Sequence, residues 1–578
     1  MTPTPGAGRP EPATGTGIGG APVEDEDPRA DLTWGTIPNL VARAASLHGG
    51  IEALVDGDVR RTYAQLPGEV DLYARAFVAA GVGPAERVAI WAPNSAAWML
   101  AALGALRAGA VLVPMNTRFK GAEAAYILRA AGATTLVSVR GFLGVDYPSL
   151  LHGEATGDLA RIVLLQSEGG AAETPAGVEM MSLDSFCAGG EGVDPAVAAA
   201  RAAALGPDDV SDLIFTSGTT GHPKGAVATH GQSLRTFGTW ASIVGLAPAD
   251  RYLVVNPFFH TFGYKAGILA CLMAGATVIP EAVFDARRVM ERIAQERITV
   301  LPGPPTLYQA LLEEPTLPEC DLSSLRLGVT GAAIVPVELV RAMRAQLGFS
   351  TVLTAYGLTE SCGTVTMCRR SDPPETVAAT SGRAIPGLEV LAVVDGAVAP
   401  PGDPGEIVVR GYTVMAGYWQ DAAATAQAID GDGWLHTGDI GVLDAERNVT
   451  ITDRVKDMFV VGGFNAYPAE IEAMLRAHPA VAQVAVIGVP DERMGEVGCA
   501  YVVPRPGHAG PSGGPVREAL GKELLLWARQ SMANYKVPRG VVVVEALPVN
   551  AGGKVLKREL RARYGAGEDH VVTNERSD

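Results

Sequence analysis

The sequence predicts an α/β protein, with a large N-terminal domain built on parallel sheets and a smaller α+β domain at the C-terminal end. Three observations predict this class. The chain has 578 residues, which is more than one hydrophobic core usually organises. Strand-like and helix-like segments alternate along most of its length. After Asp453 this alternation is replaced by a different and more compact pattern.

The alternation is clearest in the middle of the chain. Val289 and Ile293 lie four residues apart, as one face of a helix requires, and the apolar run after this helix has the composition of a buried strand. The predicted helices span 285–296, 306–313 and 337–347, and the predicted strands span 298–301, 325–330 and 350–354. This repeated order is typical of βαβ units with a largely parallel sheet.

The last part of the chain reads as a separate unit. A helix that carries Ile471, Met474 and Leu475 on one face precedes two apolar strands, and a helix ending near Gln530 and a further strand complete it. The strands are predicted at 481–489, 497–503 and 541–545. We therefore expect a disordered extension (1–32), an N-terminal domain (33–455), a mobile C-terminal domain (456–564) and a disordered tail (565–578). A loose surface connection is also expected at 188–207.

Composition excludes several function classes. The apolar fraction is 48%, the charged fraction is 19% and the net charge is −17, so neither nucleic acid nor an anionic membrane surface is expected as a partner. The most apolar stretch, 96–106, is too short to cross a bilayer. The six cysteines form no CxxC pair, which predicts reduced thiols and a cytoplasmic location. The oligomeric state stays open, with a homodimer as the assembly considered.

A phosphate-binding loop follows a predicted strand at 212–215. The string Thr-Ser-Gly-Thr-Thr-Gly-His-Pro-Lys-Gly occupies 216–225, and its hydroxyls, glycines and lysine can surround phosphate oxygens. It is not a Walker A loop, because Pro223 precedes the lysine and Gly225 follows it. A flexible turn is the alternative interpretation. The residues expected to contact ATP here are Thr216, Ser217, Gly218, Thr219, Thr220 and Lys224.

This loop resembles that of the adenylate-forming superfamily, which includes acyl-CoA synthetases, coumarate-CoA ligases, peptide-synthetase adenylation domains and beetle luciferases. Matching strings follow in the family's order from about Trp34 to Glu559. They are Tyr-Gly-Leu-Thr-Glu at 356–360, Thr-Gly-Asp at 437–439, Asp-Arg-Val-Lys-Asp at 453–457 and Leu-Pro-Val-Asn-Ala-Gly-Gly-Lys at 547–554. The resemblance implies an ATP-dependent carboxylic acid:CoA ligase that forms an acyl adenylate and then a thioester.

The resemblance also implies how ATP is held. Glu360 would supply a ligand to Mg²⁺, with Thr216 beside it, because this hard cation prefers oxygen and retains waters. Asp439 would accept hydrogen bonds from the ribose hydroxyls, with Arg454 as the matching donor. The remaining nucleotide-binding residues implied by the resemblance are Gly331, Ala332, Ala333, Thr354, Ala355, Tyr356, Gly357 and Thr359.

Two further elements of the family concern the reaction steps. Lys554 resembles the mobile catalytic lysine that bridges the substrate carboxylate and the forming adenylate. Lys456 matches the hinge about which the C-terminal domain rotates for the second half-reaction. Gly462 and Gly463 would then line the channel for the pantetheine arm of coenzyme A, since glycine allows close backbone approach.

The acid pocket is expected around Asn-Pro-Phe-Phe-His-Thr-Phe-Gly-Tyr-Lys at 256–265. His260 is interpreted either as a gate or as a base for the thiol. Lys265 is either a lysine that meets a ring ketone or one whose stem lies along apolar surface while its ammonium reaches water. The implied pocket residues are His260, Phe262, Gly263, Lys265, Gly331 and Leu358.

The string at 256–272 resembles one actinobacterial subfamily in particular. Its members ligate coenzyme A to the propanoate side chain on the bicyclic ring remnant of steroid catabolism. The alternatives are a medium- or long-chain fatty acyl-CoA ligase and an enzyme that loads a carrier protein. Two further alternatives to the ligase are a luciferase-like oxygenase and an inactive nucleotide-binding regulator. The regulator is disfavoured because Glu360 and Lys554 are both present.

Overall fold

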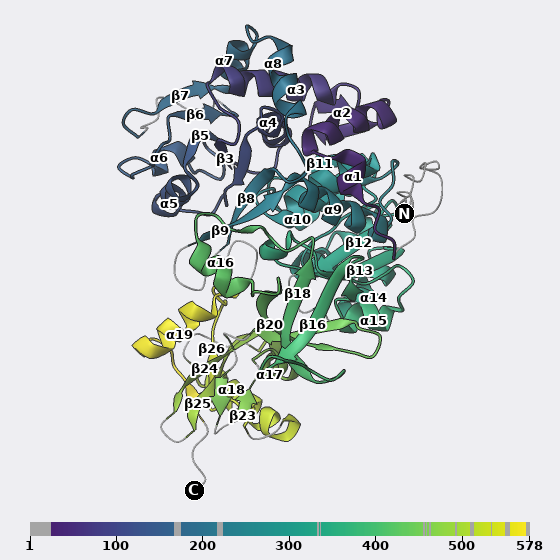
Figure 1. Ribbon diagram of the computed structural model, residues 1–578. Helices are drawn as coiled ribbons and strands as arrows, with labels where there is room; N and C mark the ends of the chain where they lie inside the picture. The colour runs from purple at the N-terminus through teal and green to yellow at the C-terminus, as the bar shows by residue number, and fades with distance from the viewer. Residues whose placement is uncertain are drawn as a thin grey trace, which may run out of the picture.

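The computed structural model describes residues 25–166, 175–216, 223–331, 335, 337–454, 457, 459–461, 464–466, 468–491, 494–508, 514–532, 535–549 and 555–573. Helices and strands alternate through the first part of the chain, which confirms the predicted α/β class. Figure 1 shows α18, α19 and β24–β26 at one end of the molecule, opposite α3, α7 and α8. No helix in the described part of the chain is long and apolar enough to cross a membrane.

The sheet that carries the predicted phosphate-binding loop, between β8 and β9, has eight strands. Their order is β19-β9-β8-β4-β3-β5-β6-β7. Its pairs from β8 to β7 are parallel, whereas β9 is antiparallel to both β8 and β19. The strands are β3 (Arg87–Trp91), β4 (Val111–Pro114), β5 (Ala133–Ser138), β6 (Arg161–Leu164), β7 (Glu179–Ser182), β8 (Val210–Thr216), β9 (Lys224–Thr229) and β19 (Gly417–Tyr418).

Two four-stranded sheets lie beside each other, in the orders β10-β11-β1-β2 and β12-β13-β14-β15. Single bridges from Val300 to Tyr252 and to Leu327 connect them. The predicted strand at 298–301 forms only these bridges at Val300, although the backbone N–H groups of Thr299 and Leu301 also donate to the neighbouring strands. The strands are β1 (Glu52–Asp56), β2 (Val59–Thr62), β10 (Arg251–Val254), β11 (Thr277–Pro280), β12 (Leu327–Gly331), β13 (Thr351–Tyr356), β14 (Thr366–Met367) and β15 (Arg383–Ala384).

A third sheet of the N-terminal part is wholly antiparallel and has its own small hydrophobic cluster around Ile407 and Val449. Its order is β17-β16-β18-β20-β21, from β16 (Leu388–Val394), β17 (Ala397–Val398), β18 (Pro404–Gly411), β20 (Leu435–Leu443) and β21 (Val449–Arg454). The sequence-based expectation of largely parallel sheets does not extend to this unit.

A separate hydrophobic cluster begins at Phe459 and includes Leu560. It surrounds a mixed sheet that consists of β22 (Phe459–Val461), β23 (Phe464–Ala466), β24 (Val481–Asp491), β25 (Gly495–Pro504), β26 (Gly540–Val543) and β27 (Val572–Thr573). The helices of this unit are α17 (Pro468–Arg476), α18 (Pro515–Ser531) and α19 (Lys557–Ala566). The exact domain boundary at residue 455 stays a prediction.

The remaining helices cover the N-terminal sheets. They are α1 (Ala30–Trp34), α2 (Ile37–His48), α3 (Leu66–Ala79), α4 (Ala96–Arg107), α5 (Gly121–Ala131), α6 (Tyr147–Leu150), α7 (Leu183–Gly190), α8 (Pro195–Ala203), α9 (His230–Val244), α10 (Thr261–Gly263), η1 (Tyr264–Leu269), α11 (Ala270–Ala274), α12 (Ala286–Glu296), α13 (Pro305–Glu313), η2 (Leu317–Glu319), α14 (Val337–Ala345), η3 (Thr359–Ser361), α15 (Pro374–Ala379) and α16 (Ala422–Ala428).

The segment predicted as a loose connection at 188–207 is instead mostly helical. Helix α8 begins after Asp194, whose carboxylate accepts a hydrogen bond from the backbone N–H of Ala196 at 2.9 Å. Pro195 occupies the first helical position, which suits its fixed φ angle, and the alanine run has the highest helix propensity. The predicted loose connection is therefore wrong over 195–203, where a capped, alanine-rich helix forms.

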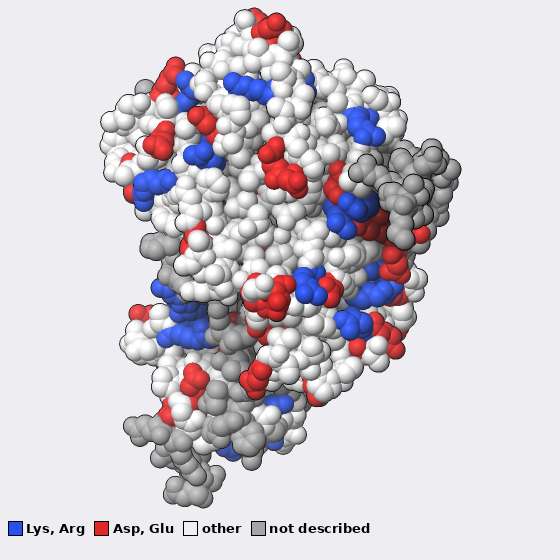
Figure 2. All heavy atoms as spheres, in the orientation of Figure 1, with Lys and Arg blue, Asp and Glu red and all other residues white. Residues whose placement is uncertain are grey.

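Both termini are ordered further outward than predicted. Asp25 accepts hydrogen bonds from Arg369 and Arg383, and Asp27 forms an ion pair with Arg235 at 2.6 Å, so the chain is fixed before residue 32. At the other end, β27 adds a strand beside β26 within the predicted tail. Figure 2 shows acidic and basic side chains interspersed over the face in view.

Candidate active site

The phosphate hairpin is formed by β8 and β9. The strand predicted at 212–215 is confirmed, and Thr216 at its end lies opposite Lys224, the first residue of β9. The two residues therefore stand at the two ends of the connecting loop, whose hydroxyls and glycines were predicted to bind phosphate. Ser217, Gly218, Thr219 and Thr220 lie outside the described residues.

Glu360 lies next to this hairpin, although it is 144 residues away in sequence. The hydroxyl of Thr216 donates to Glu360 Oε1 at 3.2 Å, and the phenol of Tyr418 donates to the same oxygen at 3.0 Å. Glu360 is held on the short helix η3, which Thr359 begins, and its backbone carbonyl accepts from the N–H of Met415. The structure thus brings together the two residues predicted at the metal site.

A second polar cluster surrounds Asp439 on β20. The phenol of Tyr356, at the end of β13, donates to Asp439 Oδ2 at 2.7 Å. Asp439 is only 3% exposed, and its backbone N–H donates to the hydroxyl of Thr437 at 3.1 Å. Arg454 occupies the position opposite Asp439 in the β20–β21 register. The side chain of Arg454 lies outside the described residues.

Gly331 and Ala355, both predicted to bind ATP, lie opposite each other on the parallel strands β12 and β13. A Cβ atom on Gly331 would lie 2.4 Å from the carbonyl oxygen of Ala355, so the close pairing requires glycine. Gly357 is exposed, and a Cβ atom there would lie 2.3 Å from the carbonyl oxygen of Gly363. Ala332 and Ala333 lie outside the described residues.

The side chain of Thr354 is directed into the protein. It is buried, and its hydroxyl donates to the backbone carbonyls of Val377 at 2.9 Å and Thr380 at 2.8 Å. The hydroxyl of Thr354 is thus engaged within the protein, and ATP binding at this residue stays a prediction. Because successive residues of a strand face opposite sides, Thr354 points toward α15 while Ala355 faces the other way.

His260 caps the short helix α10 and is exposed. Its Nδ1 atom accepts the backbone N–H of Phe262 at 3.2 Å, so the neutral ring carries its hydrogen on Nε2. A ring in this tautomer presents a donor at Nε2, and the choice between gate and base stays a prediction. Gly263 admits no side chain, since a Cβ atom would lie 2.1 Å from the carbonyl oxygen of Pro257. Phe262 and Leu358 are both half-buried.

Lys265 differs from the interpretation in which its ammonium reaches water. It lies on the π-helix η1, is 1% exposed, and its ammonium forms an ion pair with Asp212 of β8 at 2.9 Å. The same ammonium donates to Cys362 Sγ at 3.4 Å. Burial opposes the charged form, but Asp212 and Cys362 outweigh it and raise the pKa of Lys265. Lys265 therefore connects η1, β8 and the segment of Cys362 internally, and its ammonium does not reach water. Its place in the acid pocket stays a prediction.

The C-terminal residues predicted to act in catalysis, Lys554, Lys456, Gly462 and Gly463, lie outside the described residues. Their neighbours are placed. Lys557, three residues after Lys554, forms an ion pair with Glu472 at 2.8 Å, and Arg561 of the same helix donates to Asp457 at 3.0 Å. Helix α19 is thus attached to both α17 and the segment that follows the predicted hinge.

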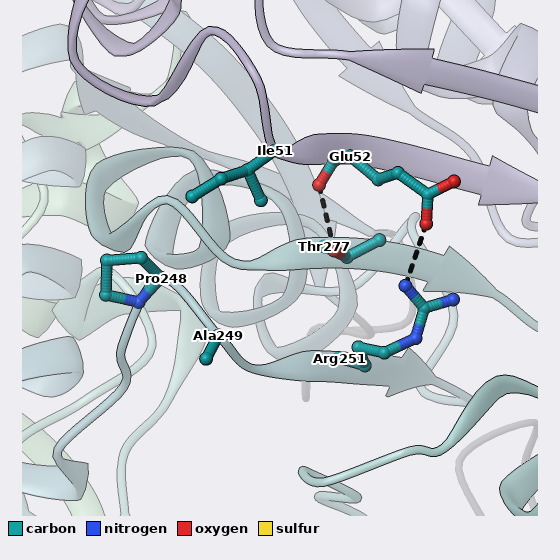
Figure 3. Close-up of a pocket in the computed structure, with 6 residues that line it drawn as sticks. All are labelled: Ile51, Glu52, Pro248, Ala249, Arg251 and Thr277. Carbon is teal, nitrogen blue, oxygen red and sulfur yellow. Dashed lines mark hydrogen bonds and ion pairs between the residues drawn. The ribbon is translucent and has the colours of Figure 1, made fainter.

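A surface pocket of about 410 Å³ lies where the strands β1, β10 and β11 begin (Figure 3). Its polar groups are already paired, since Arg251 donates to Glu52 at 2.8 Å and the hydroxyl of Thr277 donates to the carbonyl of Glu52 at 2.8 Å. It contains none of the predicted site residues. Its lining is Ile51, Glu52, Pro248, Ala249, Arg251 and Thr277.

Tyr418 is the site residue that sequence reasoning missed. Its only local signal is the string Gly-Tyr-Trp at 417–419, which suggests neither a periodic element nor a charged site. It enters the site because β19 pairs with β9, and this pairing is not evident from the sequence.

The two polar clusters and the phosphate hairpin together define an adenylate-forming enzyme. Residues 41–419 match the AMP-binding enzyme family, and residues 470–554 match the AMP-binding enzyme C-terminal domain. The chain belongs to this family and is an acid–thiol ligase of the acyl-CoA synthetase type.

The names of two relatives specify the acid that those proteins activate. The chain is 50% identical over 527 residues to the 7a-methyl-1,5-dioxo-octahydro-1H-inden-4-yl propanoyl:CoA ligase of Rhodococcus jostii, which covers 91% of this chain and 98% of that protein. Its identity to the ligase of the same name from Mycobacterium tuberculosis is 48%, with the same coverage. It also matches the crystal structure of an anthranilate CoA ligase in complex with anthranoyl-AMP, with a TM-score of 0.80, 28% identity and coverage of 93% and 99% of the two chains.

Proposed function

We propose that this ligase activates the propanoate side chain of a methyl-indanedione, the bicyclic remnant of a steroid, and transfers the acyl group to coenzyme A. The observation that carries the proposal is 50% identity across 91% of the chain to a ligase named for that acid. The site supports the adenylation half of the reaction. The Glu360 carboxylate lies beside the phosphate hairpin, and the Asp439 carboxylate accepts a hydrogen bond from Tyr356.

In the first half-reaction, a carboxylate oxygen of the acid attacks the α-phosphorus of ATP. The bond from this phosphorus to the bridging oxygen breaks, and pyrophosphate leaves. Two anions must approach each other, so positioned positive charge and donors are the main catalytic requirement. We propose that Lys224 places its positive charge at the phosphates and that Lys554 places its charge at the reacting carboxylate. Asp439 would accept hydrogen bonds from the ribose.

The residues around Glu360 fit a magnesium ion. The hydrogen bonds from Thr216 and Tyr418 both end on Oε1, which leaves the second oxygen of the carboxylate directed elsewhere. A single carboxylate with a neighbouring hydroxyl matches a cation that keeps several waters and binds substrate phosphates. When bound, the ion would supply charge neutralisation at the phosphates.

In the second half-reaction, the thiol of coenzyme A loses its proton to solvent and its sulfur attacks the acyl carbon. The bond between this carbon and the phosphate oxygen breaks, and AMP leaves with that oxygen. We propose that the C-terminal unit turns about Lys456 and brings Gly462 and Gly463 to the pantetheine arm. His260 would act as a gate whose neutral ring carries its hydrogen on Nε2. The absence of any CxxC pair among the six cysteines supports a reducing cytoplasmic location, which is part of this proposal.

The substrate is tested with a panel of acids assayed for AMP release. We expect a higher kcat/KM for the indanedione propanoate than for acetate, palmitate or coumarate, because a fused ring buries apolar area at about 25 cal/mol per Å². Equal or higher values for palmitate would favour a fatty acyl-CoA ligase. Such a result would reject the proposed acid but leave the ligase chemistry unchanged.

The thioester acceptor is a separate question. An enzyme that loads a carrier protein would share the adenylation site. Mass spectrometry of products formed with coenzyme A and with a phosphopantetheinylated carrier separates the two functions, and we expect acyl transfer to coenzyme A. Transfer to the carrier alone would contradict the proposal.

A further inference from the structure

Tyr418 is fixed by its backbone between the two parts of the phosphate site. It lies on β19 opposite Ala226 of β9, two residues after Lys224. Its backbone N–H donates to the hydroxyl of Thr425 at 2.9 Å, and the N–H of the following Trp419 donates to the carbonyl of Gly225 at 2.7 Å. The ring therefore projects from a segment that is attached to the hairpin itself.

The same segment is also attached to the loop of Glu360. The backbone N–H of Met415, three residues before Tyr418, donates to the carbonyl of Glu360 at 2.8 Å. The phenol then donates to Glu360 Oε1 at 3.0 Å, on the oxygen that also accepts from Thr216. Two donors on one oxygen restrict rotation of the carboxylate and determine where its other oxygen points.

The ring of Tyr418 makes a second contact within the same site. The face of the same ring lies 5.2 Å from the ammonium of Lys224, within the range of a cation–π contact. One half-buried side chain thus contacts both the carboxylate and the lysine of the phosphate site.

We infer that Tyr418 is a positioning residue that orients Glu360 for magnesium through its hydroxyl and orients Lys224 for the phosphates through its ring. The inference rests on the proposed function of Glu360 as the magnesium ligand. The two contacts use different parts of the side chain, so they can be removed separately. Tyr418→Phe removes the hydroxyl alone, and Tyr418→Leu removes the ring as well.

The first measurement does not depend on turnover. Binding of Mn²⁺, a paramagnetic substitute for Mg²⁺, is followed by electron paramagnetic resonance in the presence of α,β-methylene ATP. We expect Tyr418→Phe to raise the Kd of Mn²⁺ about tenfold, the low end of the cost of losing a residue that orients a metal ligand. Binding of the analogue alone is expected to change only in Tyr418→Leu, which also frees Lys224.

The matched control is Tyr412→Phe. Tyr412 is a half-buried tyrosine whose hydroxyl lies 3.4 Å from that of Thr239 and whose ring is covered by Arg235, so its replacement tests the general cost of removing a phenol. We expect this variant to bind Mn²⁺ as the unmodified enzyme does. In pyrophosphate exchange, Tyr418→Phe should need about tenfold more Mg²⁺ for half-maximal rate and should recover at high Mg²⁺.

Glu360→Gln separates the inference from the proposed function. If it weakens Mn²⁺ binding while Tyr418→Phe does not, Tyr418 has no positioning role and the inference is overturned, although Glu360 keeps its function. If Glu360→Gln leaves Mn²⁺ binding unchanged, the proposed function of Glu360 fails and the inference fails with it. Thermal unfolding of Tyr418→Phe equal to that of Tyr412→Phe would show that the difference is not a folding defect.

Discussion

At the scale of single residues, we propose that the buried carboxylate of Asp439 contributes to nucleotide affinity. Asp439→Asn keeps the size of the side chain but removes its charge. Hydrogen bonds to charged groups contribute about 1.5–3 kcal/mol, so we expect the KM for ATP to rise about 10- to 100-fold in pyrophosphate exchange. Glu389→Gln, which alters an exposed pair with Arg410, is the control. An unchanged KM for ATP would contradict the ribose role.

The buried pair of Lys265 and Asp212 gives a prediction about stability. Each side chain is 1% exposed, so removing one partner leaves the other charged and uncompensated. We expect Lys265→Met and Asp212→Asn each to lower the free energy of unfolding by about 3–5 kcal/mol in urea denaturation. The double variant should lose much less than the sum, because it leaves no isolated charge.

An exposed ion pair is the comparison for the single and double variants of Lys265 and Asp212. Lys522 and Glu518 form an i,i+4 pair with side chains 58% and 50% exposed. Lys522→Met should change the free energy of unfolding by at most about 0.5 kcal/mol. Strict additivity of the Lys265 and Asp212 losses would show that the two groups do not interact.

The sequence predicts some of these residues and not others, for a physical reason. Glu360 and Asp439 lie within short contiguous strings, and each string combines the residue types that its chemistry needs. Tyr418 and Lys265 have partners 58 and 97 residues away, so only the folded chain shows what they contact. Lysine is usually exposed, and nothing local to Lys265 indicates that β8 places a carboxylate beside it.

At the scale of elements, strong periodicity in the sequence predicts helices and strands that the structure contains. The predicted helix at 285–296 corresponds to α12, and the strand at 350–354 corresponds to β13. Errors arose where the decisive interaction was a cap or a long-range pairing. The cap at Asp194 defines α8, and the pairing of β18 with β16 and β20 builds an antiparallel sheet that alternation does not predict.

Helix α19 gives a prediction that belongs to this scale. It follows the loop of Lys554, and Lys557 attaches its first turn to Glu472, which also accepts the backbone N–H of Val486 at 2.8 Å. Lys557→Met keeps the length of the side chain but removes this attachment. We expect pyrophosphate exchange to fall about tenfold, because a loosely held catalytic loop loses orientation. Thioester formation from supplied acyl adenylate should change little.

The control for this variant lies in the same helix. Arg558→Met alters a neighbouring exposed cation that contacts no other described residue through a hydrogen bond or ion pair, and it should leave both half-reactions unchanged. Equal losses in both half-reactions for Lys557→Met would instead indicate a general role in the fold of the C-terminal unit.

At the scale of the whole molecule, two hydrophobic cores are joined through the segment that was predicted as the hinge. Val449 belongs to the core of the antiparallel sheet, and Phe459 already belongs to the C-terminal core. We propose that the second unit rotates between the half-reactions, because Lys554 and the glycine pair are expected to act in different steps. The sequence predicts this division because the two cores occupy separate stretches of chain.

Rotation of the C-terminal unit predicts that Lys554→Ala slows the first half-reaction but not the second. Removing one preorganised charge at a developing anion costs about 10²–10³ in rate, so pyrophosphate exchange should fall by that factor. Formation of acyl-CoA from supplied acyl adenylate should remain largely intact, since the lysine is not needed for thiol attack. Stopped assays of each half-reaction measure the two rates, and equal losses would remove the assignment of Lys554.

Gly463→Leu should show the reverse pattern. Its bulk would obstruct the pantetheine channel without contacting ATP, so acyl-CoA output should fall while pyrophosphate exchange persists. The two variants together test rotation more strictly than either alone, because a rigid enzyme with one active arrangement would couple both half-reactions to both residues. If pyrophosphate exchange collapsed in Gly463→Leu, the glycine segment would serve the first half-reaction or the fold, and the alternation of two arrangements would lose its support.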